Sequence, residues 1–174
     1  YTGTLDPAQG LVQHRPADGD DWATITRRAP VSEGDWVRTD TVGLAYLRFF
    51  DGVESEILPD SVVQVSQLAL DTRDDSFQLS LDVVAGDALH RLERTLDANS
   101  RYRIFTPGAS LTVRGTEFWV SVTTEGETQI NAMDGEVLVI SGRVEPEALD
   151  EISAAYWANE PLPVPPDQVR PVEA

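Results

Sequence analysis

The chain has 174 residues and a formal net charge of −17, with 30 acidic residues against 13 basic ones, all of them arginine, and no cysteine. A chain of 174 residues suits one domain with short appendages. Without cysteine there is no disulfide framework, thiol nucleophile or thiolate metal site. The acidic balance excludes binding to nucleic acid phosphates and opposes docking on an anionic membrane.

No apolar run reaches the roughly 18 residues of a membrane span, and no signal-peptide pattern is present. The first residue is Tyr1 instead of methionine, so we expect a segment of a longer protein. Any anchor or export signal would then lie outside the segment. We predict no direct membrane insertion by this segment itself.

Residues 1–9 are predicted to form an extended leading segment, and residues 10–141 a β domain. In the latter, runs rich in Val, Thr, Ile, Phe and Trp alternate with Gly, Asp, Asn and Pro clusters, which is typical of strands and turns. The predicted strands are Leu11–Arg15, Trp22–Thr26, Trp36–Thr39, Val42–Phe50, Glu54–Leu58, Ser61–Leu70, Ser76–Val84, Ala88–Leu92, Arg101–Phe105, Ser110–Val113, Thr116–Thr123, Thr128–Ala132 and Glu136–Ile140.

Several of these strands alternate between apolar and polar positions, as half-buried strands do. A weak internal echo, Glu33–Val37 against Val84–Ala88, suggests stacked β layers. We therefore predict an all-β fold, a compact stacked β-solenoid-like or sandwich-like domain with one short C-terminal α-helix.

The helix is predicted over residues 144–159, where Pro146 suits the first turn and Leu149, Ile152 and Tyr156 recur at helical spacing. We expect this amphipathic helix to pack on the β domain. Residues 160–174 contain five prolines and are predicted to form an extended linker or tail with few contacts.

The segment Phe105–Val120 contains Thr-Pro, a small-residue strand, Val-Arg-Gly-Thr and an aromatic strand, and it closely resembles the hallmark of the FecR-type domain. The resemblance covers roughly residues 10–141. The motif residues that carry it are Gly34, Asp35, Asp51, Gly52, Thr106, Pro107, Arg114, Gly115, Thr116, Phe118, Asp134 and Gly135.

The resemblance implies an extracytoplasmic all-β module, periplasmic or on the cell surface, anchored through a segment outside this chain. In the namesake system such a domain lies beyond a single membrane span and passes a signal from an outer-membrane receptor to a cytoplasmic sigma factor. A further partner-binding subdomain follows there. Here a helix and a proline-rich tail follow instead, which argues against the same receptor partnership.

Arg114 has two interpretations. Its guanidinium either recognises a carboxylate of a ligand or partner, or is half-buried and satisfies carbonyls or an acidic neighbour at a strand corner. We favour the second, because Gly115 beside it marks a bend or a close backbone approach. Thr116 is expected to close that corner with a hydroxyl bond to the backbone.

Tyr46 and Trp119 are predicted to lie opposite the core-facing residues of their strands. They form either an exposed surface for a partner or a face covered by another layer or by the C-terminal helix. The possible partner-binding surface is therefore assigned to these two residues.

The sequence contains no residue pattern that is typical of a catalytic site or a metal site. Glu54 and Glu56 lie on one face of a strand, as glycoside hydrolysis would require, but they flank turns. The acidic clusters do not fit a calcium loop, and His14 and His90 lack metal-ligand spacing. The acidic clusters are Asp18, Asp20 and Asp21, and Asp71, Asp74 and Asp75. We predict no catalytic residue, no metal and no cofactor.

The leading hypothesis is a non-enzymatic extracytoplasmic sensory or interaction domain of a membrane-tethered protein, with a protein partner or a cell-envelope component. Two alternatives remain. One is a structural or adhesive cell-envelope module without signalling output. The other, weaker, is a carbohydrate-active enzyme that uses Glu54 and Glu56.

Overall fold

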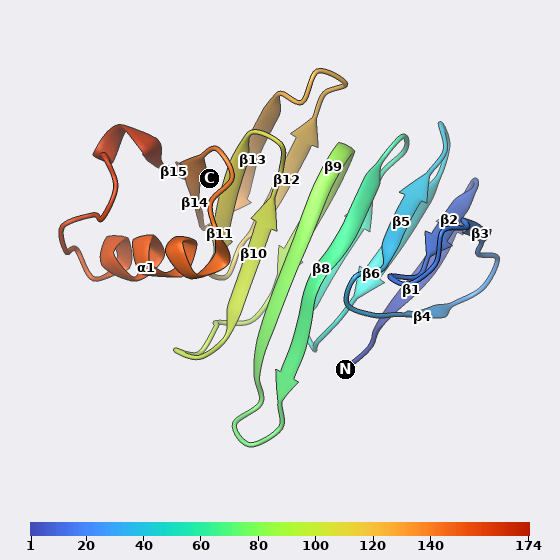
Figure 1. The fold of residues 1–174 in the computed structure, drawn as a ribbon, viewed down its shortest axis with the longest axis horizontal. Coiled ribbons are helices and arrows are strands. Elements are labelled where there is room, and N and C mark those ends of the chain that lie inside the picture. Colours follow the sequence, from blue (N-terminus) through green and yellow to red (C-terminus); the bar gives the residue numbers. More distant parts are fainter.

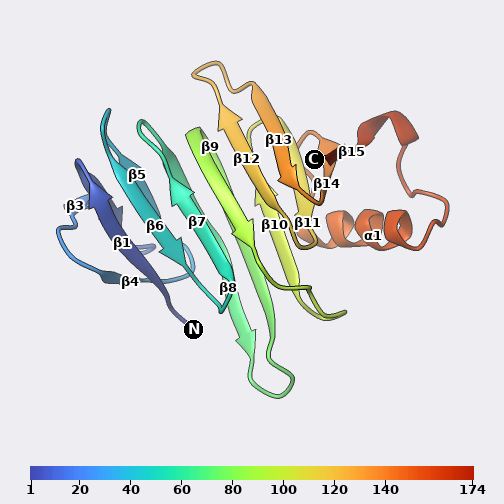
Figure 2. The ribbon, with the colours of Figure 1, turned by 180° about the vertical axis from the view of Figure 1, so that it is seen from behind.

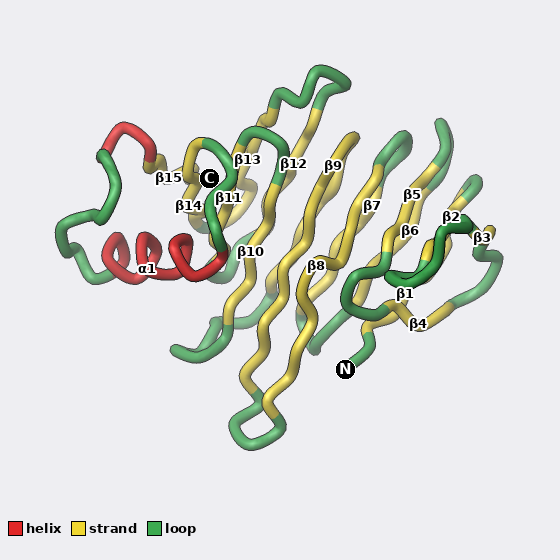
Figure 3. Tube along the Cα trace, in the orientation of Figure 1, coloured by secondary structure: helices red, strands yellow, loops and turns green.

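The computed structural model describes residues 1–174, and its regular secondary structure is mostly β-strand, with one α-helix at one end (Figures 1 and 3). Hydrogen bonds connect all 15 strands in one network. The network folds into two layers, which we call sheet A and sheet B, with the main hydrophobic core between them. The predicted all-β, sandwich-like fold with one short C-terminal helix is confirmed.

Sheet A lies in front in Figure 2. It contains, in spatial order, β4 (Ala29–Val31), β1 (Gly3–Gln9), β6 (Leu44–Arg48), β7 (Val53–Ile57), the second half of β9 (Ser76–Leu92), β12 (Glu117–Val122) and β13 (Thr128–Asp134). Neighbouring strands in this sheet are antiparallel.

Sheet B lies in front in Figure 1. It contains β3 (Ala23–Thr24), β2 (Val12–Arg15), β5 (Trp36–Thr39), β8 (Val62–Asp71), the first half of β9, β10 (Arg101–Phe105), β11 (Ala109–Val113), β14 (Glu136–Ser141) and β15 (Val169–Glu173). Its one parallel pair is β9 with β10.

The long strand β9 joins the two sheets. Residues up to Ala85 pair with β8, and residues from Gly86 pair with β12. Gly86 has a φ of +83°, and a Cβ built there would overlap the Ser61 hydroxyl and the Asp60 carbonyl. The sequence pattern predicts two strands here, because the glycine interrupts the alternation; the structure keeps one strand and uses the glycine to change sheets.

The core between the sheets is filled by the inward-facing positions of both layers. On β6 and β12 buried and half-buried residues alternate along the strand, as the sequence predicts. Leu5, Val12 and Val31 are fully buried in the same core. The N-terminal strands therefore belong to the same hydrophobic unit as the rest of the domain.

The helix α1 (Pro146–Trp157) lies within the predicted range and covers the outer face of sheet B at one end. Leu149 and Ile152 are buried against Phe105, Leu138 and Ile140 in a second, smaller hydrophobic cluster. Pro146 occupies the first turn, where a missing backbone N–H leaves no helical hydrogen bond unmade. No helix of the structure combines the length and apolarity needed to cross a membrane.

The two ends of the chain differ from the sequence-based expectation. Residues 1–9 are not a separate extended segment, because β1 pairs with both β4 and β6 inside sheet A. Beyond a short 3₁₀ turn, η1 (Pro166–Gln168), the proline-rich tail ends in β15, which pairs along β14 from Ile140 to Glu136. Prolines are tolerated there because β15 is an edge strand. The division into domains at residues 10 and 141 stays a prediction.

Candidate functional site

The motif residues around the Val-Arg-Gly-Thr segment meet the Asp-Gly turn that closes the domain. Gly115 has a φ of +85°, and a Cβ at Gly135 would lie 2.8 Å from the Gly115 carbonyl. Thr116 is buried and its hydroxyl donates to the Glu117 carbonyl at 3.3 Å. The close approach of the two corners accounts for glycine at position 135, and the positive φ accounts for glycine at position 115.

The Gly34-Asp35 motif organises the N-terminal part of sheet B. The Asp35 carboxylate accepts hydrogen bonds from the backbone N–H groups of Ala17 at 3.0 Å and Ser32 at 2.9 Å, and it contacts His14 Nε2 at 2.8 Å. It is only 6% exposed. Asp35 therefore holds three segments together and is not available to a ligand.

The remaining motif residues also lie at corners or in the core. The Thr106 hydroxyl shares a 2.6 Å hydrogen bond with Thr128 and accepts one from the Ala109 N–H at 3.0 Å, beside Pro107. Phe118 is fully buried. Asp51 and Gly52 form the β6–β7 turn, and Asp134 precedes Gly135 at the β13–β14 turn.

Arg114 is the exception. The structure does not support a half-buried arginine that satisfies carbonyls: Arg114 is exposed, and its side chain makes no hydrogen bond or ion pair. Its guanidinium carbon lies 5.1 Å from the ring centre of Trp157 on α1. The residue following β11 points to the solvent because Val113 before it faces the core, and the helix supplies an aromatic face at that point.

Arg114 and Trp157 border a groove of about 440 Å³ between α1, the β10–β11 hairpin and the loop before β10. The sheet side contains Arg101, Tyr102, Thr112, Val113 and Arg114. The helix side contains Asp150, Ser153, Ala154, Trp157 and Ala158, and the loop side Leu96, Asp97, Ala98 and Ser100. Half of its lining residues are hydrophobic. A cavity of this size and mixed lining suits a small ligand or the end of a peptide.

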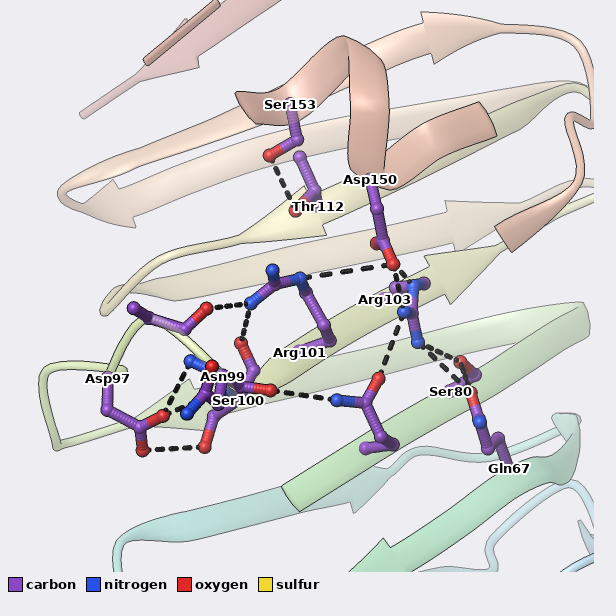
Figure 4. A network of polar contacts seen from close by, with 12 residues as sticks. Gln67, Ser80, Asp97, Asn99, Ser100, Arg101, Arg103, Thr112, Asp150 and Ser153 are labelled. Atoms are coloured by element: carbon purple, nitrogen blue, oxygen red, sulfur yellow. Dashed lines mark hydrogen bonds and ion pairs between the residues drawn. The ribbon is translucent and has the colours of Figure 1, made fainter. Parts of the chain in front are cut away.

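A buried arginine fixes the helix wall of this groove (Figure 4). Arg103 is 3% exposed and makes a bidentate ion pair with Asp150 of α1, at 2.8 and 2.5 Å. It also donates to Gln67 at 3.0 Å and to Gln78 at 3.1 Å. Because both carboxylate oxygens of Asp150 accept a hydrogen bond from Arg103, the pair holds the helix over sheet B.

The loop wall is fixed by Asp97 (Figure 4). Its carboxylate accepts from the backbone N–H groups of Asn99 and Ser100, both at 2.8 Å, and from the Ser100 hydroxyl at 2.7 Å. These hydrogen bonds lower the pKa of Asp97, and the bond from the Ser100 hydroxyl has the largest effect. Polar contacts therefore hold two walls of the groove in place, the helix and the loop.

Sequence reasoning identified Arg114 but missed the groove. On the helix, Asp150, Ser153 and Trp157 recur three and four residues apart on one face, which indicates a polar and aromatic stripe beside the apolar one. The partners of that stripe come from residues more than 35 positions away, and no local pattern points to them.

Tyr46 and Trp119 occupy half-buried positions that alternate with core residues of β6 and β12, so they lie on the outer face of sheet A. No helix covers that face (Figure 2). Register places Tyr46 opposite Glu56, Glu56 opposite Leu89, and Leu89 opposite Trp119. Three strand spacings separate the two aromatic residues, about 14 Å. The C-terminal helix covers sheet B instead, so this face stays open, and its role in partner binding remains a prediction.

Glu54 and Glu56 belong to a row of ion pairs on this same face. Arg48 binds Glu54 at 2.7 Å, and Arg91 binds both glutamates at 3.2 Å. Asp6 and Glu117 extend the row at its two ends. Neither glutamate lines the groove. The pair is part of a charge ladder across five strands, and its geometry gives no support to a pair of catalytic carboxyls.

In the second acidic cluster, Asp71 and Asp74 have partners within the protein. Asp71 forms an ion pair with Arg73, and Asp74 accepts from the backbone of Ser76 at 3.0 Å and from Asn99 at 3.0 Å. No group of three or more His, Asp or Glu side chains is arranged to hold a metal ion.

One polar cluster in the core was not expected from the sequence. Ser55 Oγ lies 2.7 Å from His90 Nδ1 and 3.2 Å from the Tyr102 hydroxyl. All three residues are at most 1% exposed, and His90 stacks on Phe118 with 5.0 Å between ring centres. Burial lowers the pKa of His90 to about 3. The serine and histidine are a pair that no substrate can reach, so the cluster is structural.

The fold defines an all-β, two-layer domain with one helix that borders a groove. The sequence matches the family described as FecR protein over residues 35–138, which is more than half of the chain. The chain belongs to the FecR family, and the resemblance noted in its motifs is confirmed.

Comparison with solved structures finds two crystal structures of a "putative anti-sigma factor" from Parabacteroides distasonis ATCC 8503. Their identities to this chain are 16% and 17%, and their TM-scores 0.49 and 0.48. Each match covers 63% of this chain and 48% of the other, so the chain spans about half the length of those proteins. Comparison with curated proteins finds no match.

Proposed function

We propose that this chain is the extracytoplasmic sensory or interaction domain of a membrane-tethered protein, exposed to the periplasm or the cell surface, and that it relays the binding of a ligand or partner. The observation that carries the proposal is membership of the FecR family over residues 35–138. The proposed activity is binding and not catalysis, with a protein or a cell-envelope component as the partner.

Two surfaces support a binding role. One is the open face of sheet A with Tyr46 and Trp119, where aromatic side chains lie beside a charge ladder. Aromatic residues and arginines are enriched where interfaces gain most of their affinity. The other is the groove beside Arg114. A net charge of −17 makes nucleic acid an unsuitable partner for either surface.

Location is tested with reporter fusions to the full-length protein, joined after Ala174. Alkaline phosphatase is active only outside the cytoplasm, and β-galactosidase only inside. We expect phosphatase activity and no galactosidase activity. The reverse pattern would reject an extracytoplasmic domain, whatever the groove binds.

Signalling is tested by removing residues 1–174 from the full-length protein in its source organism and measuring the transcripts of the cell. A relay predicts a change in a defined group of promoters. A purely structural or adhesive module predicts none. The double variant Tyr46→Ala/Trp119→Ala should reproduce the change if sheet A binds the partner, whereas Val84→Ala, an exposed apolar residue elsewhere, should not.

A further inference from the structure

We propose that the groove between α1 and the β10–β11 hairpin binds a carboxylate attached to an apolar group, with Arg114 as the charge that receives the carboxylate. The inference rests on the proposed function, because a sensory domain needs a site for the molecule that it senses. It assigns that site and the chemical class of its ligand.

The first argument is the unused cation. Arg114 is exposed, has no acidic partner and makes no hydrogen bond, although the chain carries 30 acidic residues. Trp157 supports its guanidinium from one side at 5.1 Å and so limits its orientations. A planar guanidinium held in this way presents paired N–H donors, which match the two oxygens of a carboxylate.

A second cation lies on the same side of the groove. Arg101 donates through Nη1 to the Ala98 carbonyl at 2.6 Å and to the Ser100 carbonyl at 2.8 Å, which pins its guanidinium at the rim. Its Nε is 3.9 Å from Asp150, beyond hydrogen-bond distance. Arg101 therefore keeps donors free to add to the positive field that Arg114 creates.

Neither acid of the groove forms an ion pair with Arg114, and Asp150 reaches Arg101 only at 3.9 Å. Asp97 is occupied by the backbone of its own loop and by Ser100. Asp150 is occupied by Arg103, with which it forms a neutral pair. Counted as formal charges, Arg101, Arg103 and Arg114 face Asp97 and Asp150, which leaves about one positive charge at the groove in a chain of net charge −17.

The apolar part of the ligand is defined by the rest of the lining. Leu96, Val113, Ala154 and Trp157 line the groove. The volume of the groove, about 440 Å³, accommodates an aromatic or branched aliphatic group. The carboxylate and the apolar group must lie close together, since Trp157 contacts both regions. An amino acid derivative, a small organic acid and the carboxyl terminus of a peptide share this chemistry.

The experiment is an NMR titration of the 174-residue chain, followed at backbone amide and tryptophan indole N–H groups. The probe is N-acetyl-L-phenylalanine, and N-acetyl-L-phenylalaninamide is the same molecule without the carboxylate. We expect saturable shifts at Arg114, Ala154 and the Trp157 indole, with binding of the amide at least about tenfold weaker. Equal binding of the two probes, or no saturable shift at the groove up to about 10 mM, would overturn the proposal.

Two arginine variants make the test specific. Arg114→Gln should weaken binding of the acid at least about tenfold, because one charge-assisted contact is lost. Arg170→Gln, an exposed arginine of β15 that does not line the groove, should bind as the unchanged chain does. Both side chains are exposed, so both variants should keep the dispersed spectrum of the folded chain. Unchanged affinity in Arg114→Gln would refute the role of this residue.

Peptides separate the possible sources of the ligand. A hexapeptide with a C-terminal phenylalanine is titrated as the free acid and as the amide. Binding of the free acid as tight as that of the small probe indicates a chain end, and binding of the small probe alone indicates a small organic acid. Both outcomes support a carboxylate site. A groove that ignores every probe in a domain shown to be extracytoplasmic rejects this inference only, and cytoplasmic location rejects only the proposed function.

Discussion

His90 shows how a single buried titratable residue links the core to pH. It is fully buried beside Ser55, Tyr102 and Phe118, and its Nε2 atom has no hydrogen-bond partner. Protonation would place an uncompensated charge in the core. Burial therefore lowers the pKa of His90 in the folded chain from 6.5 to about 3.

The consequence is a pH dependence of stability that can be isolated. Below pH 6.5 His90 is protonated in the unfolded chain, whereas in the folded chain it stays neutral until the pH falls to about 3. The contribution of His90 to stability is complete above pH 6.5 and decreases as the pH falls, by up to about 1.4 kcal/mol per pH unit. His90→Phe should lower stability at neutral pH but flatten this slope.

Urea unfolding between pH 6.5 and about 4.5 measures both slopes. The carboxylates titrate equally in the two proteins, so the difference between the slopes belongs to His90. Identical slopes in the variant and the unchanged chain would show that the histidine is not held neutral.

At the scale of elements, β9 is the strand on which the two layers depend. Its change of sheet at Gly86 is locked by Ser61, whose hydroxyl accepts from the Asp87 N–H at 2.9 Å and donates to the Asp87 carbonyl at 3.0 Å. The Pro59-Asp60-Ser61 corner thus packs directly on the crossing point. A side chain at residue 86 would separate the two.

Gly86→Ala should therefore destabilise the chain by about 3 kcal/mol or more, from the positive φ and from overlap with the corner. Gly142→Ala is the matched control: its φ of +79° is similar to the +83° of Gly86, but a Cβ there has nothing within 4 Å. The control should lose only about 1 kcal/mol. Chemical denaturation compares the two, and equal losses would mean that the close approach at Gly86 is absent in solution.

The edge strand β15 places one glutamate directly opposite another on β14. Register places Glu173 opposite Glu136 of β14. Desolvation, and then the hydrogen bond and charge of Glu173, raise the pKa of Glu136. Because the pKa is raised in the folded chain, docking of β15 gains stability as the pH falls through that value and loses it above.

Glu173→Gln should stabilise the chain at neutral pH by about 0.2–1 kcal/mol, since like charges directly opposite each other are unfavourable. The gain should disappear at acidic pH, where the unchanged pair shares a proton. Melting temperatures at the two pH values measure it, with the exposed Glu160→Gln as control. A loss of stability at neutral pH would contradict the like-charge contact.

At the scale of the whole molecule, the core extends beyond the family match at residues 35–138. Leu5, Val12 and Val31 are fully buried in the main cluster, and Leu149 and Ile152 cover Phe105 and Leu138. Strands β1, β2 and β4 close one end of the sandwich, and α1 protects the other.

A chain of residues 35–138 alone should therefore lack cooperative unfolding and bind hydrophobic dyes, because it exposes both clusters to water. The 174-residue chain should unfold in one transition. Circular dichroism during heating and dye fluorescence compare them. A cooperative transition of the short chain at the same temperature would show that the N-terminal strands and the helix are dispensable.

Local patterns in the sequence determined the class of fold, most strand positions, the helix and the family. The alternation of apolar and polar residues along Val42–Phe50 and Thr116–Thr123 depends only on the two faces of a strand. It can therefore be recognised without knowledge of the rest of the chain. The motif glycine at 115 indicated a corner for a similarly local reason, its backbone freedom.

The tertiary structure alone decided which strand belongs to which sheet, where Arg114 points and what it meets. Whether Gly86 ends a strand or bends it, and whether the proline-rich tail docks, depend on neighbours distant in sequence. The groove is assembled from a loop, a hairpin and a helix, and Arg103 meets Asp150 across 47 positions. Such contacts arise from long-range strand pairing and packing, which one-dimensional periodicity does not encode.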